Sequence, residues 1–272
     1  MDRTNWQWGK FDINILTLAI AFKGIAIPIY WELLDKKGNS DTQERISLIQ
    51  KFINRFGKDC IAGLLADREF IGDDWFRWLL IEKIPFYIRI KKNFITTDSR
   101  GRTVHAEALF RGTTINEERI LYGKRKILGH ALYIAGLKLL DGDLLIVATS
   151  EMPGDAIKKY SLRWEIETLF SCLKSRGFYF EDTHITDRSR IKKLFVLLAI
   201  AFCWAHKIGE WRHEFRPIKI KKHGRLSISL FRYGLDYIAD IVLHFSKKFT
   251  LFKSCLDSIR PNNFLDLIEG VI

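Results

Sequence analysis

Four polar side chains between residues 160 and 174 have types and a spacing that suit chemistry on a phosphodiester. If this segment is a helix that turns about 100° per residue, Tyr160, Arg163, Glu167 and Lys174 fall within one arc of about 60°. A carboxylate that holds a divalent cation, with cationic groups one or two turns away, suits metal-assisted chemistry on a phosphodiester. Glu and Arg four residues apart also form ordinary surface pairs, so the spacing alone leaves a functional and a structural interpretation open.

The apolar side chains of the same segment predict which face of the helix is buried. They fall on the side opposite to the polar stripe, as in a helix that packs one face against a core and exposes the other. The predicted core face comprises Leu162, Ile166, Leu169, Phe170 and Leu173. Glu165 falls away from the polar stripe and is not expected to join it.

A metal site needs more than one carboxylate, and Asp67 is the best second candidate. It directly follows an apolar stretch from Cys60 to Ala66 that predicts a buried strand. A charge there must lie at the edge of the sheet or be bound to something, and ligands of open α/β sheets bind beyond the carboxyl ends of the strands. An ordinary helix N-cap or turn residue is the alternative. Asp2 is a third candidate, which its sequence position does not distinguish from other acidic residues near a chain end.

The elements that must position these residues predict an α/β chain. Residues 14–34 favour two strands joined by a turn at Lys23-Gly24, because a continuous helix would bury Gly24 and Pro28. A capped helix from Asp41 to Gly57 follows, then the strand that ends at Ala66, a helix from Asp73 to Lys83 and a strand from Phe86 to Ile90. This order predicts a mixed sheet flanked by helices.

The following stretch, residues 91–150, is rich in short β-type pieces and turn residues. Between Lys83 and Lys126 there are eleven Lys and Arg residues and four Asp and Glu residues. Asp141-Gly142 predicts a hairpin turn. We interpret this stretch as a basic, β-rich insertion and not as a separate domain. Helices dominate from Asp155 to the end of the chain, with a buried helix predicted at Leu194–Ala205.

Composition narrows the class of partner and the compartment. The net charge is +12 and 13% of the residues are aromatic, which fits a folded protein with a polyanionic partner such as nucleic acid. The four cysteines lie far apart, which argues against a zinc site or a disulfide framework and favours a reducing cytoplasm. The longest uncharged apolar run is shorter than the roughly 20 residues that span a bilayer. We therefore expect a soluble, intracellular protein with no membrane partner.

The spacing Tyr160-x2-Arg163-x3-Glu167-x6-Lys174 resembles the YREK signature of bacterial DDE transposases of the insertion-sequence-4 group. The resemblance extends to the residues around this signature and to four further stretches of the chain. Asp67-Arg68-Glu69-Phe70 resembles that family's second catalytic-aspartate block, and Asp2-Arg3-Thr4-Asn5-Trp6 resembles its first. His223-Gly224-Arg225 and Phe231-Arg232-Tyr233-Gly234-Leu235 are similar to its C-terminal region. The blocks occur in the family's order and cover nearly the whole chain.

The resemblance implies a fold and a division of the chain into regions. The fold is expected to be ribonuclease-H-like: a mixed α/β sheet flanked by helices, with a β-rich insertion before the last catalytic helix and a helical C-terminal part. The expected regions are the first part of the catalytic core at 1–90 with an incomplete first strand, the insertion at 91–150, the remainder of the core with the signature helix at 151–212, and a helical region at 213–272.

The resemblance also implies an activity, which is metal-dependent cleavage at transposon ends and strand transfer into target DNA. By similarity, Asp2, Asp67 and Glu167 would be the catalytic residues and would bind two Mg²⁺ or Mn²⁺ ions. The expected DNA contacts are Tyr160, Arg163, Lys174 and Arg68. The implied partners are double-stranded DNA and, in the DNA complex, a second copy of the chain. The implied location is the bacterial cytoplasm at the nucleoid.

One departure from the family concerns the first strand. The family places several strand residues before its first catalytic aspartate, whereas only Met1 precedes Asp2 here. We therefore expect a partial copy that is poorly stable and weakly active or inactive, and that lacks an N-terminal DNA-recognition region. Two alternatives remain open. One is an inactive DNA-binding remnant that interferes with a full-length transposase. The other is a host ribonuclease-H-like nuclease that cuts without strand transfer.

Overall fold

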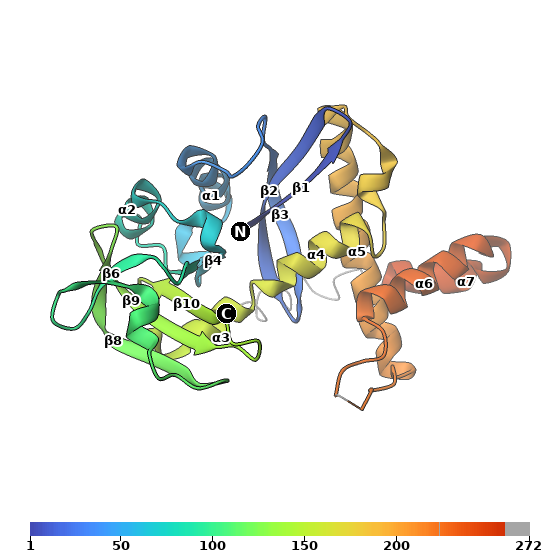
Figure 1. The fold of residues 1–272 in the computed structure, drawn as a ribbon. Helices are drawn as coiled ribbons and strands as arrows, with labels where there is room; N and C mark the ends of the chain where they lie inside the picture. The colour runs from blue at the N-terminus through green and yellow to red at the C-terminus, as the bar shows by residue number, and fades with distance from the viewer. Residues whose placement is uncertain (223, 259–272) are drawn as a thin grey trace. The chain divides into compact units, whose positions relative to one another are not determined.

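The computed structural model describes residues 1–222 and 224–258, and the chain divides into two compact units, Met1–Thr168 and Leu169–Ile272 (Figure 1). The first unit holds all the strands named below and the second is helical in its described part. His223 and the end of the region expected at 213–272 lie outside the described residues. The four regions expected from the sequence stay a prediction.

The first unit begins with an antiparallel three-stranded sheet. Its strands are β1 (Asp2–Trp8), β2 (Phe11–Phe22) and β3 (Ile25–Leu33), in that order. The turn predicted at Lys23-Gly24 is confirmed: both residues have positive φ, 48° and 87°, as a tight type I′ hairpin turn requires. Asp2 lies within a strand, opposite Thr17, and is therefore held by the sheet.

The helix after this sheet forms where the sequence predicts it. α1 (Thr42–Phe56) begins after Asp41, whose side chain accepts from the Glu44 amide while the Glu44 side chain accepts from the Asp41 amide. This reciprocal capping satisfies backbone donors that the first helical turn leaves unpaired. The helix buries Leu48 and Ile49 in the core of the unit.

A second, five-stranded sheet has the order β4-β5-β10-β9-β8 and is mixed, because β4 pairs parallel with β5 and the other pairs are antiparallel. Its strands are β4 (Leu64–Ala66), β5 (Phe86–Ile90), β8 (Glu118–Ile127), β9 (His130–Lys138) and β10 (Leu144–Thr149). β4 is shorter than the predicted strand from Cys60 to Ala66. Lys58–Cys60 forms a 3₁₀ turn, with Cys60 exposed, and residues 61–63 lie outside the strand.

Both faces of this sheet are covered by helices. α2 (Asp73–Ile81) packs Trp75, Phe76 and Leu79 into the same core as alternate residues of β5, β9 and β10. On the other face, α3 (Ala156–Ser161) packs against Tyr87 and Val147. Side chains alternate between the faces of a strand, so each central strand contributes to both cores. The predicted α/β class, with a mixed sheet flanked by helices, is confirmed.

The β-rich stretch contributes to this same core. A small hairpin of β6 (Ile95–Thr97) and β7 (Thr103–His105) precedes β8. β8, β9 and β10 then extend the sheet that β4 and β5 begin, and Asp141-Gly142 stands in the turn between β9 and β10. The short β-type pieces predicted for residues 91–150 are present as strands β6 to β10.

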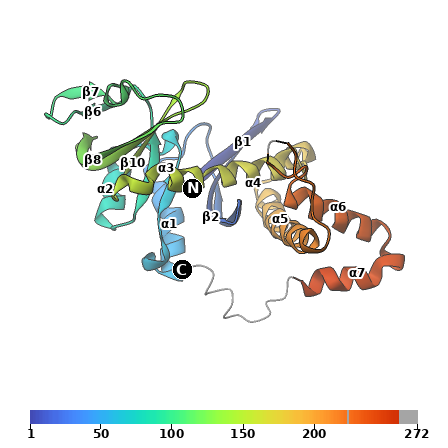
Figure 2. The same cartoon turned by 90° about the horizontal axis from the view of Figure 1, so that it is seen from below.

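Helices form the described part of the second unit, as predicted. They are α5 (Arg188–Phe215), α6 (Leu230–Leu243) and α7 (Phe245–Asp257), after α4 (Trp164–Lys174), which begins in the first unit. α5 and α6 lie side by side (Figure 2), closely enough that a Cβ on Gly234 would stand 1.8 Å from the Ala205 carbonyl oxygen. No helix in the described part has the length and apolar character needed to cross a membrane.

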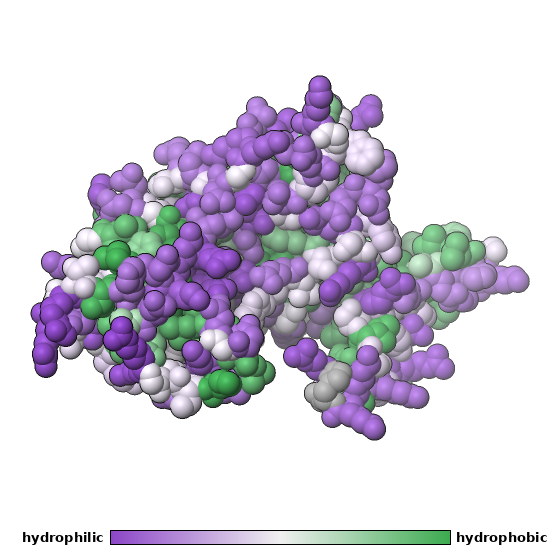
Figure 3. Space-filling view, in the orientation of Figure 1, coloured by the Kyte–Doolittle hydropathy of each residue, from purple (hydrophilic) through white to green (hydrophobic). Residues whose placement is uncertain are grey.

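Exposed apolar side chains correct one expectation for this unit. The helix predicted as buried at Leu194–Ala205 is the middle of α5, and only one face of it is buried, through Phe195, Ala199 and Phe202. Its other face exposes Val196, Leu197 and Ile200, because segments that pack on one side of a helix cover only part of its surface. Further exposed apolar residues, Val242, Leu243, Phe245 and Phe249, lie around the junction of α6 and α7 (Figure 3).

Candidate active site

The segment that carries the candidate signature is two helices and not one. α3 ends at Ser161 and α4 begins at Trp164, and the amide of Arg163 donates to the Tyr160 carbonyl at 2.9 Å across the junction. This tighter i→i−3 bond changes the direction in which the following side chains point. Leu162, predicted in the core face, is exposed, whereas Ile166, Leu169, Phe170 and Leu173 are buried as predicted.

Tyr160 and Arg163 are buried, which contradicts the prediction that the polar stripe is an exposed edge. Tyr160 is 1% exposed and Arg163 is 5% exposed, whereas more than half of the Glu167 side chain is exposed. The helix break brings the phenol and the guanidinium together, with Arg163 Nε donating to Tyr160 Oη at 3.0 Å. A buried guanidinium requires partners for all its donors, and acidic groups from the rest of the unit supply them.

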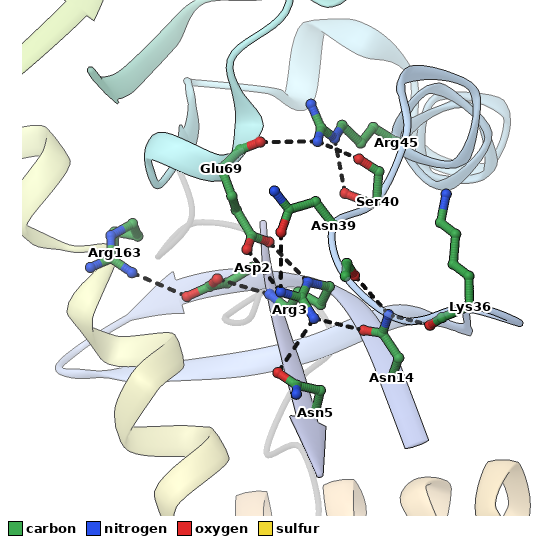
Figure 4. A network of polar contacts seen from close by, with 11 residues as sticks. Asp2, Arg3, Asn5, Asn14, Lys36, Asn39, Ser40, Arg45, Glu69 and Arg163 are labelled. Atoms are coloured by element: carbon green, nitrogen blue, oxygen red, sulfur yellow. Dashed lines mark hydrogen bonds and ion pairs between the residues drawn. The ribbon is translucent and has the colours of Figure 1, made fainter. Parts of the chain in front are cut away.

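The Arg163 guanidinium contacts two of the three candidate carboxylates. Its Nη1 lies 3.1 Å from Asp2 Oδ2 on β1, and its Nη2 lies 2.6 Å from Glu167 Oε1 on α4. Figure 4 shows Arg163 directed at Asp2 across the start of the first sheet. Residues separated by more than 160 positions in sequence therefore meet at one cation.

The third candidate, Asp67, joins the same group through Tyr160. Tyr160 Oη donates to Asp67 Oδ1 at 3.2 Å. Asp67 directly follows β4 and is the N-cap residue of a short 3₁₀ segment, Arg68–Phe70. Its side chain forms no capping hydrogen bond. The structure thus brings Asp2, Asp67 and Glu167 to one Tyr160–Arg163 pair. We call these five residues the carboxylate cluster.

Burial and neighbouring charges shift the pKa values of Asp2, Tyr160 and Arg163. The pKa of Asp2 is raised because burial penalises its charge, and the Arg3 amide and Arg163 offset part of that effect. The pKa of Tyr160 is also raised, first by burial, so the phenol keeps its proton and can donate to Asp67. For Arg163, burial opposes the charge, but the neighbouring Tyr160, Glu167 and acidic groups outweigh it and raise the pKa. The guanidinium is therefore a permanent cation.

The two remaining predicted DNA contacts, Arg68 and Lys174, are not members of this cluster. Arg68 directly follows Asp67 and is exposed. Lys174 is the last residue of α4 in the second unit, where its Nζ lies 3.3 Å from Glu181 Oε2. Glu181 had not been singled out from the sequence.

Two sets of positioning contacts were missed by sequence reasoning. Glu165, which was not expected to take part, accepts from the amides of Phe22 at 3.0 Å and Gly24 at 3.1 Å and so fixes the start of α4 to the β2–β3 turn. Arg3 forms a two-bond ion pair with Glu69, at 3.2 and 3.1 Å. The only sequence signal for this pair is that each member lies within two residues of a candidate aspartate.

The donor chemistry of the carboxylate cluster fits a hard divalent cation, since Mg²⁺ and Mn²⁺ prefer carboxylate oxygens. Two of the three carboxylates contact the Arg163 guanidinium and the third accepts from Tyr160, so carboxylate oxygens from three segments lie around one pair of side chains. Within the described residues no group of three acidic, His or Cys side chains already stands at metal-holding distances. Arg163 lies between Asp2 and Glu167, and the exposed Glu167 side chain is the one with room to rotate.

Comparison with known proteins gives one family match. Residues 16–204 match the model of a family described as the transposase DDE domain, a range that includes Asp67 and Glu167 but begins after Asp2. No curated protein matches the chain. Among solved structures, a piggyBac transposase in a synaptic complex with hairpin DNA is similar at 13% identity and a TM-score of 0.41. The match covers 97% of this chain and 52% of that transposase, so this chain spans about half its length.

Proposed function

We propose that this chain, which belongs to the transposase DDE domain family, is the catalytic part of a DNA transposase. The reaction would be metal-dependent strand cleavage at transposon ends, followed by strand transfer into target DNA. The observation that carries the proposal is the meeting of Asp2, Asp67 and Glu167, from three separate segments, at the Tyr160–Arg163 pair. The mixed sheet with helices on both faces is compatible with a ribonuclease-H-like core.

In this proposal Asp2, Asp67 and Glu167 hold two Mg²⁺ or Mn²⁺ ions. Such ions supply Lewis acidity and activate a water or a 3′-hydroxyl for in-line displacement at phosphorus. Asp2 and Asp67 are the fixed members, because one is buried in a strand and the other follows a strand directly. Glu167 is the mobile member and would complete the site by turning away from Arg163.

Tyr160 and Arg163 have a positioning role in this proposal. They hold the carboxylates together and keep water from the buried side of the cluster. A contact between either residue and a DNA phosphate, as the family resemblance implies, would require that they first be uncovered. Arg68 is exposed beside Asp67 and is the better placed of the proposed phosphate contacts in the first unit. Lys174 remains the proposed contact from the second unit.

The proposed partner is double-stranded DNA, at transposon ends and at the target. The family match and the net charge of +12 support this partner, because cationic proteins gain affinity for DNA by releasing counterions. We further propose that a dimer of the chain acts on paired ends, at the nucleoid of a bacterial cell.

The test compares the wild-type chain with Glu167→Gln on a DNA duplex that carries the terminal repeats flanking the gene. With Mg²⁺ or Mn²⁺ present, wild type should cut strands and form joined products, and Glu167→Gln should lose both while its DNA affinity changes little. Glu214→Gln alters an exposed glutamate in α5 and is the matched control. Binding without metal-dependent cutting in the wild type would favour an inactive remnant. Cut ends without joined products would favour a nuclease.

A further inference from the structure

Arg3 and Glu69 form a shielded ion pair beside the carboxylate cluster. The Arg3 side chain is 12% exposed and that of Glu69 is 22% exposed. Two parallel bonds join them, from Arg3 Nε to Glu69 Oε1 and from Arg3 Nη2 to Glu69 Oε2. This fork geometry fixes the direction as well as the distance between the groups. Figure 4 shows the pair at the centre of a network of polar contacts.

The guanidinium of Arg3 is itself held by side chains from other segments. Its Nη1 donates to Asn14 Oδ1 on β2 at 3.1 Å, and its Nη2 donates to Asn39 Oδ1 at 3.4 Å. Asn14 in turn donates to the carbonyls of Lys36 and Gly38, both at 2.9 Å. Arg3 is therefore fixed against β2 and the loop before α1, and its side chain has little freedom to follow a displaced partner.

Glu69 is held from a second side through its main chain. Arg45 of α1 donates to the Glu69 carbonyl at 3.1 Å and to the side chain and carbonyl of Ser40. Arg45 is buried, at 4% exposure, and its guanidinium also lies over the Phe70 ring. The short segment after Asp67 is thus fixed to β1 by a side chain and to α1 by its backbone.

These contacts act on the two aspartates through very short stretches of chain. Arg3 follows Asp2, and its amide donates to Asp2 Oδ1 at 2.8 Å. Glu69 lies two residues after Asp67, within the turn that the Phe70 amide closes on the Asp67 carbonyl at 2.9 Å. Asp2 and Asp67 belong to different parts of the sheet system, since β1 lies in the first sheet and β4 in the second. The ion pair spans these two sheets next to both aspartates.

We infer that Arg3–Glu69 is a positioning pair that sets the separation of Asp2 and Asp67 and thereby the affinity of the cluster for divalent cations. The inference rests on the function proposed above. Neither member has to touch an ion. Groups that orient metal-binding side chains typically contribute about 10-fold to 100-fold in metal affinity, and a spacing error between two carboxylates should act in the same range.

The experiment is a calorimetric titration of Mn²⁺ into the full chain without DNA. The variants are Arg3→Gln, Glu69→Gln, the double variant and Glu167→Gln. Each single change in the pair should weaken Mn²⁺ binding about 10-fold. The double variant should bind Mn²⁺ at least as tightly as the single variant with the lower affinity, because the two residues act as one unit. The neutral amides of the double variant leave no unpaired charge, so it also serves if a single variant folds poorly.

Lys51→Gln is the matched control. It removes an exposed ion pair, between Lys51 and Glu32 at 3.0 Å, and should leave Mn²⁺ binding unchanged. If Glu167→Gln abolishes binding while the pair variants bind like wild type, or if the two single effects add in full, the inference is wrong and the proposed function stands. If Glu167→Gln and wild type bind Mn²⁺ equally, the proposed metal site fails and the inference fails with it.

Discussion

Replacing Arg163 by Gln should destabilise the first unit strongly, and the loss should shrink as the pH falls. Arg163 is the cation that compensates the Asp2 charge inside the cluster, at 3.1 Å from Asp2 Oδ2. Gln occupies part of the same space and can donate one hydrogen bond, but it carries no charge. The variant therefore leaves a carboxylate buried in a strand, with the Arg3 amide and the terminal ammonium of Met1 to stabilise its charge.

The magnitude follows from how deeply each partner is buried. Both Arg163 and Asp2 are shielded, with side chains 4% and 13% exposed, and removing one partner of a buried ion pair costs about 3–5 kcal/mol. The contact with Glu167 adds little, because more than half of that side chain is exposed and such pairs contribute about 0–1 kcal/mol. We expect a loss of about 3 kcal/mol at neutral pH, since Gln retains part of the packing.

The pH dependence follows from the sign of the shift at Asp2. Burial already raises the pKa of Asp2 in the wild type, and loss of Arg163 raises it further. For an acid whose folded pKa lies above its unfolded value, the stabilising effect of the bound proton is present below the unfolded pKa and is lost as the pH rises through the folded pKa. The penalty for Arg163→Gln should therefore be smaller near pH 4.5 than at pH 7.5.

Urea denaturation followed by circular dichroism at both pH values measures this prediction. Glu167→Gln is the control, because it removes the exposed contact of the same guanidinium and should cost less than about 1 kcal/mol. The reasoning would be refuted if Glu167→Gln were the more destabilising variant, or if the Arg163→Gln penalty were the same at both pH values.

Three further predictions concern the supports of the site and the second unit. Glu165→Ala should lower stability by about 1–2 kcal/mol in urea denaturation, because it leaves two turn amides without their acceptor. Burial lowers the pKa of His206, so stability should fall as the pH drops below about 6.5, and His206→Leu should flatten that part of a thermal-melting profile. Gly234→Ala should destabilise the second unit, although Ala normally favours a helix by about 1 kcal/mol over Gly. The added Cβ would stand 1.8 Å from the Ala205 carbonyl oxygen, and the melting temperature should show which effect is larger.

Local signals in the sequence predicted most of the first unit. The turn at Lys23-Gly24 and the capping box of Asp41 and Glu44 depend on a few neighbouring residues, and both occur as predicted. Such signals could not show that β1–β3 form a sheet apart from β4, because strand pairing is decided by long-range packing. They also could not locate the break before Trp164. Helical periodicity assumes one continuous helix, whereas here buried contacts at Tyr160 and Arg163 outweigh the regular helical bond pattern.

The candidate site shows the same division between local and long-range information. The spacing of Tyr160, Arg163 and Glu167 is visible in the sequence, but the contact between Tyr160 and Arg163 in the structure forms across the break between α3 and α4. Nothing local connects them with Asp2 or Asp67. Those contacts arise because β1 and the end of β4 are brought to the α3–α4 junction by the packing of the unit. The Arg3–Glu69 pair could not be predicted from the sequence for the same reason, since 66 positions separate its members.

The charge balance of the carboxylate cluster connects its present arrangement with the proposed chemistry. Asp2, Asp67 and Glu167 carry three negative charges when ionised, and Arg163 supplies one positive charge, because Tyr160 stays neutral. Two negative charges therefore remain among these five residues. Burial penalises the charge of Asp2 and raises its pKa, whereas more than half of the Glu167 side chain is exposed. A proton can relieve this excess only by occupying an oxygen that would otherwise be a ligand. A bound divalent cation would neutralise this charge and keep the oxygens as ligands. The charge balance therefore supports the proposed binding of such ions by the carboxylate cluster.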